Sequence, residues 1–287
     1  MRDVFGSFRD FLDRRVTRLG LLAEAAGRQA GPVPDLDRAA SVETEWGPLF
    51  IDAADEVIRP AIEKHGIWEP GETALLLGWL GPGMTVVDVG AHVGYYTVLA
   101  ARRVAPGGLV LAFEPSPRNY ELLLANVWRN GLTNVVCFPW AVSDRMAFLD
   151  LFTDERNTGD NRTFPSPGRE RVRVRAVALD ALPSIRPPID VVKIDVQGTE
   201  EAVVAGMSNL LARSRSARIT LEYWPFGLRA LGRDERGALD YYRSLGYRLR
   251  VQNPERPGIE DLTDDEILAY CSAYEGVLHT NLVLTRT

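Results

Sequence analysis

The stretch TVVDVGAHVGYYTVLA, residues 85–100, decides the fold of this 287-residue chain. It begins as an apolar run, which is typical of a strand that is buried on both faces. The run ends near Asp88, and Gly90 and Gly94 flank a turn that leads into a helical pattern. Either this turn only connects a strand to a helix, or it also forms part of a binding site for a small molecule.

The alternation of strand and helix continues along the chain. Apolar runs predict strands at 84–90, 108–114, 135–142, 189–196, 217–224, 247–252 and 279–287. Helical patterns are found at 69–83, 95–104, 117–131, 200–214 and 235–246. This order predicts an α/β fold with an open, doubly wound, mostly parallel sheet and helices on both faces. No clear helix precedes the last strand. Both a parallel and an antiparallel position of this strand in the sheet therefore stay open.

Several segments fall outside the alternation. The first 27 residues have an amphipathic helical pattern, and we predict that residues 1–67 form an N-terminal helical extension or lid on a main domain at 68–287. Residues 145–182 contain two alternating runs around a polar loop, which indicates a β-hairpin-like insertion. Residues 253–278 are acidic and rich in loops.

Composition and charge exclude several classes of protein. The net charge of −6 argues against a partner that is a nucleic acid. Cys137 and Cys271 have no ligand-like spacing, so neither a disulfide framework nor a zinc site is predicted. No apolar stretch is long enough for a membrane span, and the charged N-terminus is unlike a signal peptide. We therefore expect a cytoplasmic protein.

The turn after Asp88 lacks the G-x-G-x-x-G spacing of a dinucleotide site, because only Gly90 and Gly94 are present. A carboxylate at this position repels a pyrophosphate but suits a cation. The next strand ends in Glu114, where a carboxylate is placed to bind the hydroxyls of a ribose. Together these residues predict a pocket for a nucleoside that carries a cationic amino acid, and S-adenosylmethionine is such a compound.

Further polar residues follow the other predicted strands. Asp144 comes after the third strand, Asp195 ends the fourth, and Glu222 lies near the end of the fifth. Asp144 suits either adenine recognition or a local turn. Aromatic residues at these strand ends either line an acceptor pocket or belong to the core: Tyr95, Tyr96, Trp140, Tyr223, Trp224 and Phe226.

Four motifs of the chain, DVGAHVGYYT, FEPSPRNYELLLANV, AVSD and VVKIDVQGTEEAVVAG, occur in the order and spacing of a known family. In this respect the chain closely resembles the FkbM-type S-adenosylmethionine-dependent methyltransferases over about residues 68–225. The resemblance implies a Rossmann-like seven-stranded methyltransferase sheet and makes 68–287 the methyltransferase domain.

The resemblance also assigns roles to individual residues. It implies cofactor binding by Asp88, Gly90, Gly94, Glu114 and Asp144. His92 stands where the family usually has Asn, and we keep it as a cofactor-binding candidate, although His also suits a tight turn. Asp195 would lie between the cofactor and the acceptor.

The family implies O-methylation of a hydroxyl on a small molecule such as a sugar, a polyketide or another specialised metabolite. A hydroxyl must lose its proton during attack, and Asp195 is the first candidate base, followed by Glu222, His279 and His92. We predict no metal, although Asp195 with Glu222 or Asp144 offers oxygen ligands for a divalent cation. A non-catalytic partner protein with this fold, a nicotinamide-dependent oxidoreductase and a homo-oligomer stay open.

Overall fold

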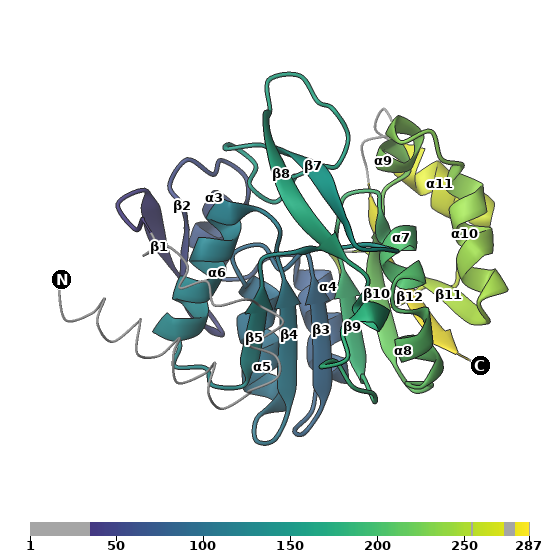
Figure 1. Cartoon of the computed structure of the whole chain (residues 1–287), viewed down its shortest axis with the longest axis horizontal. Helices are drawn as coiled ribbons and strands as arrows, with labels where there is room; N and C mark the ends of the chain where they lie inside the picture. The colour runs from purple at the N-terminus through teal and green to yellow at the C-terminus, as the bar shows by residue number, and fades with distance from the viewer. Residues whose placement is uncertain (1–34, 254, 273–278, 287) are drawn as a thin grey trace.

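The computed structural model describes residues 35–253, 255–272 and 279–286. Its centre is a seven-stranded sheet with the order β11-β12-β10-β9-β3-β4-β5 (Figure 1). The strands are β3 (Thr85–Val89), β4 (Leu109–Phe113), β5 (Val135–Phe138), β9 (Val191–Ile194), β10 (Arg218–Tyr223), β11 (Tyr247–Gln252) and β12 (Thr280–Arg286). The strands β10, β9, β3, β4 and β5 pair in parallel, and β12 runs antiparallel to both neighbours. The predicted doubly wound α/β sheet is thus confirmed.

Helices cover both faces of this sheet. One face packs against α3 (Ile58–His65), α4 (Pro70–Trp79), α5 (Tyr95–Val104) and α6 (Pro117–Arg129). The other packs against α7 (Glu200–Ala205), α8 (Ser208–Ala212), α9 (Pro225–Ala230), α10 (Glu235–Ser244) and α11 (Asp264–Ser272). Because side chains alternate along a strand, Val86 belongs to the first core and Val87 to the second.

The helix predicted at 200–214 is two short helices, α7 and α8, with Gly206 between them. A Cβ atom at Gly206 would lie 1.9 Å from the carbonyl oxygen of Ser143. The chain after β5 therefore passes too close to Gly206 for any larger residue, and the Ser143 segment lies against the turn between α7 and α8.

Two additions flank the sheet. β1 (Ala39–Thr44) and β2 (Gly47–Asp52) form an antiparallel hairpin, so the described part of the predicted helical extension contains strands as well as α3. The helix predicted over the first 27 residues lies outside the described residues. β7 (Ala147–Thr153) and β8 (Glu170–Val177) pair antiparallel, which confirms the predicted hairpin-like insertion. With β6 (Ala141–Val142) they form a second sheet, whose strands β7 and β8 lie above the central strands of the first in the view of Figure 1.

Candidate functional site

A cavity of about 570 Å³ lies at the carboxyl ends of the parallel strands. Its wall includes the segments that follow β3, β4, β5, β9 and β10. The extension contributes Ile58, and the insertion contributes Thr158. The volume is in the range of pockets that bind small molecules and cofactors. Both additions to the sheet therefore complete the wall of one cavity.

The strand register brings the three predicted catalytic residues to this rim. Ile194 pairs with Leu221, so Asp195 and Glu222 follow side by side. The Nδ1 atom of His279, which precedes β12, is 3.8 Å from Oε1 of Glu222. All three predicted residues line the cavity.

The buried Glu222 and the partly exposed His279 form a close pair of titratable groups. Burial and Asp195 raise the pKa of Glu222 well above its ordinary value. Burial disfavours the charged form of His279, but Glu222 and Glu69 outweigh it and raise the pKa of His279 to about 10. The pair therefore retains a proton at neutral pH. The Oε2 atom of Glu222 is buried without a hydrogen-bond partner in the described part of the chain, although Glu222 lines the cavity.

The carboxylate of Asp195 is oriented by its neighbours. Its Oδ2 atom is 3.4 Å from Nζ of Lys193, and its Oδ1 atom accepts a hydrogen bond of 2.9 Å from the Gln197 side chain. Gln197 has a left-handed backbone conformation, with φ of 58°. A Cβ atom at Gly90 would lie 1.8 Å from the carbonyl oxygen of Asp195. Gly90 thus permits the close approach of the β3 turn to Asp195.

Glu114 is held at the end of β4 by the turn after β3. Its two carboxylate oxygens accept 2.8 Å hydrogen bonds from the backbone N–H groups of His92 and Ser116. Burial raises the pKa of Glu114 to about 7, although these two bonds oppose the shift. Each oxygen has a further lone pair, so the carboxylate has the capacity to accept bonds from a ribose.

His92 joins this carboxylate to the insertion. The residue has φ of 53°, which agrees with the expectation that His suits a tight turn. Its Nε2 atom is 2.8 Å from Oγ1 of Thr158, and that hydroxyl donates a 2.6 Å bond to Asp55. Since the Thr158 hydrogen points to Asp55, Thr158 accepts from the Nε2–H of His92. Burial lowers the pKa of His92 to about 4, so the ring is neutral at pH 7.

Asp88 lies beneath the cavity and is not among the residues that line it. It pairs across the sheet with Lys193, and its Oδ2 atom accepts a 2.6 Å bond from Thr97 of α5. Its Oδ1 atom has no hydrogen-bond partner among the described residues. Asp88 is therefore placed to support Lys193 and α5, and a direct bond from Asp88 to a cofactor stays a prediction.

The remaining cofactor-binding candidates lie at two places. Gly94 is the N-cap residue of α5, with φ of 94°, and a Cβ atom there would lie 2.7 Å from the Leu123 side chain. Asp144 lines the cavity with a half-exposed side chain, 3.5 Å from the Arg145 guanidinium. Of the predicted aromatic residues, Tyr95, Tyr96, Trp140 and Trp224 line the cavity, whereas Tyr223 belongs to the core.

Two residues of the site were not predicted. Glu69 lines the cavity, accepts a 3.0 Å bond from Tyr96, and is 3.8 Å from Nε2 of His279. Its φ of 41° is uncommon for a residue with a side chain. The signal for Glu69 is its place before Pro70, where a helix begins. Thr158 had no signal beyond its place in a polar loop.

No group of three or more His, Cys, Asp or Glu side chains in the described ranges is arranged to hold a metal ion. Nor does any helix within those ranges combine the length and the apolar character needed to cross a membrane.

The carboxylates that line the cavity fit a nucleoside with a cationic amino acid. Glu114 offers a carboxylate at one strand end, and Asp195 and Glu69 offer carboxylates near the other. Carboxylates suit ribose hydroxyls and an ammonium or sulfonium group.

Comparisons with known proteins agree with this chemistry. A family model described as the methyltransferase FkbM domain matches residues 88–249. A protein-L-isoaspartate O-methyltransferase from Aeropyrum pernix is 40% identical over 82 residues, which are 27% of this chain and 32% of that protein. The match therefore spans about a third of that relative's length.

Solved structures of methyltransferases are similar at low sequence identity. A precorrin-6y C5,15-methyltransferase from Geobacter metallireducens is 16% identical, with a TM-score of 0.43 over 75% of this chain and 87% of that one. An S-adenosylmethionine-dependent O-methyltransferase from Thermotoga maritima is 15% identical, with a TM-score of 0.45 over 86% and 78%. A putative methyltransferase from Streptococcus mutans, in complex with S-adenosylhomocysteine, is 9% identical, with a TM-score of 0.45 over 75% and 96%.

The family model covers more than half of the chain, from Asp88 at the end of β3 to Leu249 in β11. Its match includes the glycine turn, Glu114, Asp195 and Glu222. The chain belongs to the FkbM methyltransferase domain family, and it is an S-adenosylmethionine-dependent methyltransferase.

Proposed function

We propose that this enzyme methylates a hydroxyl group of a small molecule and that Asp195 accepts the hydroxyl proton. The observation that supports this most is the pair of carboxyl groups at neighbouring strand ends. Asp195 and Glu222 both line the cavity, and the buried Oε2 atom of Glu222 lacks a hydrogen-bond partner in the described segments. An acceptor hydroxyl between these groups would satisfy Glu222 and face a base.

The cofactor would lie across the ends of β3, β4 and β9. Glu114 would bind the ribose hydroxyls, and Asp144 would contact the adenine edge. Glu69 would attract the charged methionine end. When bound, S-adenosylmethionine supplies a methyl group on a positively charged sulfur. Asp88 would support the site indirectly, because it pairs across the sheet with Lys193 and accepts a hydrogen bond from Thr97.

Asp195 is better suited than His279 to receive the proton. The pKa of His279 is raised to about 10, so His279 already holds a proton at neutral pH. The Asp195 carboxylate is fixed by Lys193 and Gln197, and a third of its side chain is exposed toward the cavity. General base catalysis by a group within hydrogen-bond reach contributes about 10²- to 10⁴-fold in rate. Glu222 and His279 would position the acceptor oxygen.

The net charge of the chain favours a small molecule over a nucleic acid. The cavity itself is lined by acidic and basic groups, such as Asp195 and Glu69 together with Lys193 and Arg162. A phosphate backbone would be repelled by the net charge of −6.

The test uses S-adenosylmethionine with a labelled methyl group and a panel of hydroxylated small molecules, read by mass spectrometry. For an acceptor found this way, Asp195→Asn is expected to lower kcat about a hundredfold or more. S-adenosylhomocysteine should still bind, as calorimetry would show. A matched control is Asp150→Asn, because Asp150 forms a similar 3.5 Å ion pair with Arg171 on the exposed insertion.

Two results would contradict the proposal. A kcat of Asp195→Asn within twofold of the wild type would remove Asp195 as the base. If the enzyme methylated RNA or a nitrogen atom in preference to every hydroxyl compound of the panel, the proposed class of acceptor would be wrong.

A further inference from the structure

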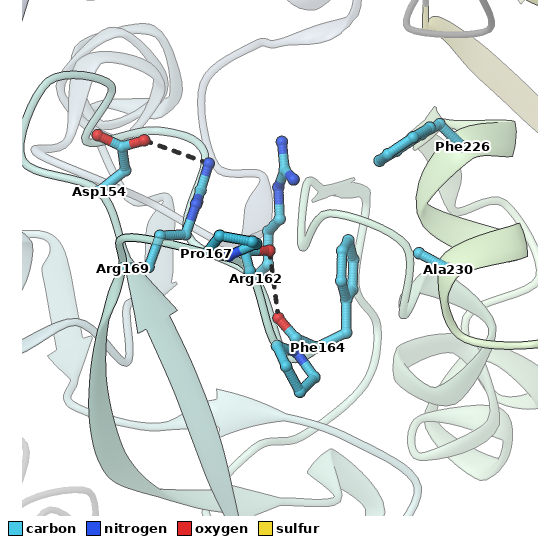
Figure 2. Close-up of a pocket in the computed structure, with 9 residues that line it drawn as sticks. Asp154, Arg162, Phe164, Pro167, Arg169, Phe226 and Ala230 are labelled. Atoms are coloured by element: carbon cyan, nitrogen blue, oxygen red, sulfur yellow. Dashed lines mark hydrogen bonds and ion pairs between the residues drawn. The ribbon is translucent and has the colours of Figure 1, made fainter.

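A second cavity, of about 460 Å³, adjoins the first at Arg162 (Figure 2). The loop between β7 and β8 forms most of its wall, and α9 contributes Phe226 and Ala230. Arg162 lines both cavities. The two cavities therefore share Arg162 as a common wall, and we refer to this second space as the outer cavity.

An aromatic wall continues from one cavity into the other. Trp224 lines the central cavity, and its ring centroid is 5.2 Å from that of Phe226 in the outer cavity. Phe164, which also lines the outer cavity, has its ring centroid 6.3 Å from that of Trp224. The guanidinium of Arg162 lies over the Trp224 ring at 4.8 Å from its centroid. The outer cavity thus offers flat apolar faces beside a cationic group.

The charges of the outer cavity are paired within the protein. Arg162 donates to both carboxylate oxygens of Asp160, at 2.7 Å and 2.6 Å. Arg169 is 2.6 Å from Asp160 and 3.3 Å from Asp154. Figure 2 shows Arg162 between the Arg169–Asp154 pair and the two phenylalanines. Two arginines and two aspartates leave no net charge that would favour an ionic ligand.

Polar hydrogen-bonding groups remain at the edge of this neutral cavity. The Nη1 atom of Arg162 has no hydrogen-bond partner in the described ranges of the chain. Asp154 and Ser166 line the same space. Asp154 pairs with Arg169 and accepts from two backbone N–H groups, and the Ser166 hydroxyl makes a long 3.5 Å bond to the Phe164 carbonyl, so the oxygen atoms of both side chains have the capacity to accept further bonds. A wholly apolar ring would remove these groups from water without replacing their bonds, which costs free energy. A ring with hydroxyl groups at its edge would replace them.

We infer that the outer cavity is a second acceptor subsite, which holds a neutral, hydroxylated ring such as a sugar. This inference rests on the proposed function, because it places the methylated hydroxyl in the central cavity. One face of the ring packs against Phe226 and Phe164, while its hydroxyl groups contact Arg162, Asp154 and Ser166. The acceptor is then a molecule with at least two parts, and the outer ring determines specificity.

The experiment measures fragment binding by saturation-transfer-difference NMR in the presence of saturating S-adenosylhomocysteine. Its probes are methyl β-D-glucopyranoside, the anionic methyl β-D-glucuronide and cyclohexanol. The variant is Phe226→Ala, whose side chain is 38% exposed in the wild type. The matched control is Phe148→Ala, because Phe148 is also exposed and lies under Arg173, outside both cavities.

We expect the glucopyranoside to bind the wild type best of the three probes. Phe226→Ala should weaken it about threefold to tenfold, and Phe148→Ala should leave it unchanged. Three results would overturn the inference: no detectable binding of the glucopyranoside, equal binding by Phe226→Ala, or tighter binding of the glucuronide or of cyclohexanol. Calorimetry with S-adenosylhomocysteine and the Asp195→Asn assay test the proposed function separately, so the two failures are distinguishable.

Discussion

The Nε2 atom of His92 lies 2.8 Å from the hydroxyl oxygen of Thr158, although 66 positions separate the two residues in the chain. His92 belongs to the glycine turn after β3, and its backbone N–H donates to Glu114. Thr158 also donates to Asp55, which the extension contributes. A single chain of hydrogen bonds thus joins the extension and the insertion to the carboxylate that we assign to the ribose.

Thr158→Val is expected to weaken the binding of S-adenosylhomocysteine about tenfold. Valine keeps the shape of threonine but leaves the Nε2–H of His92 without its partner, and an unpaired buried polar group costs about 1–3 kcal/mol. Asp55 loses one bond and keeps the one from the backbone N–H of residue 158. Thr158→Ser restores the hydroxyl and should bind within about twofold of the wild type. Calorimetry provides the affinities.

The control for this variant is Thr153→Val, at the base of the same insertion. The Thr153 hydroxyl makes a long 3.5 Å bond to Glu170 at an exposed position. If Thr158→Val and Thr158→Ser bind the ligand equally well, the hydroxyl of Thr158 has no part in positioning His92.

The sheet could be predicted from the sequence because its signals are local. Apolar runs that end in glycine turns, such as the one at 85–100, mark buried parallel strands. The break between α7 and α8 could not be predicted, because the contacts found there are distant in sequence: Gly206 approaches Ser143, 63 positions away, and Asp180 accepts from the first N–H groups of α8. Such close approaches are visible only in three dimensions.

The site could be predicted in part. Asp195, Glu222 and Glu114 are found at the cavity because a residue that ends a parallel strand lies at the ligand-binding edge of the sheet. Asp88 differs, since its side chain points to α5, where Thr97 donates a hydrogen bond to it. Thr158 could not be found, because a loop residue has no periodic pattern that fixes its direction.

Gly90→Ala is expected to lower stability by more than about 3 kcal/mol or to prevent folding. A Cβ atom would overlap the Asp195 carbonyl oxygen, and the φ of 77° adds strain. Gly78→Ala in α4 is the matched control, since no atom lies within 4 Å of its Cβ position. Alanine in a helix should stabilise the protein there by about 0.5–1 kcal/mol. Denaturation in urea measures both, and similar values for the two variants would refute the close contact.

Glu200→Gln is expected to make the stability of the protein less dependent on pH. Burial raises the pKa of Glu200 from 4.5 to about 7, although backbone N–H groups oppose the shift. Because the pKa is raised on folding, this group stabilises the fold most below pH 4.5, and that stability is lost as pH rises through 7.

Glutamine keeps the oxygen that accepts from Val196 and Gly198 but does not ionise. The variant should therefore gain about 2–3 kcal/mol relative to the wild type between pH 5 and pH 8. Urea denaturation at both values provides the test, and parallel curves would contradict it.

Lys193→Met is expected to destabilise the protein by about 3–5 kcal/mol at pH 8, because it leaves buried carboxylates without a cation. Burial raises the pKa values of Glu72, to about 8, and of Asp88, and Lys193 restrains both shifts. Without Lys193 both pKa values rise further, so the carboxyl groups take up protons on folding. The loss of stability should be smaller at pH 5, where Glu72 is already protonated in the folded protein.

Two further variants separate the lost charge from the lost packing around Lys193. Adding Asp88→Asn to Lys193→Met removes one uncompensated charge and should recover part of the stability at pH 8, since asparagine retains an oxygen for Thr97. Lys64→Met changes the chain's other lysine, which is exposed on α3, and should have an effect below about 0.5 kcal/mol. If Lys193→Met were equally destabilising at pH 5 and pH 8, and Asp88→Asn recovered nothing, Lys193 would act through packing and not as the counter-ion of Asp88.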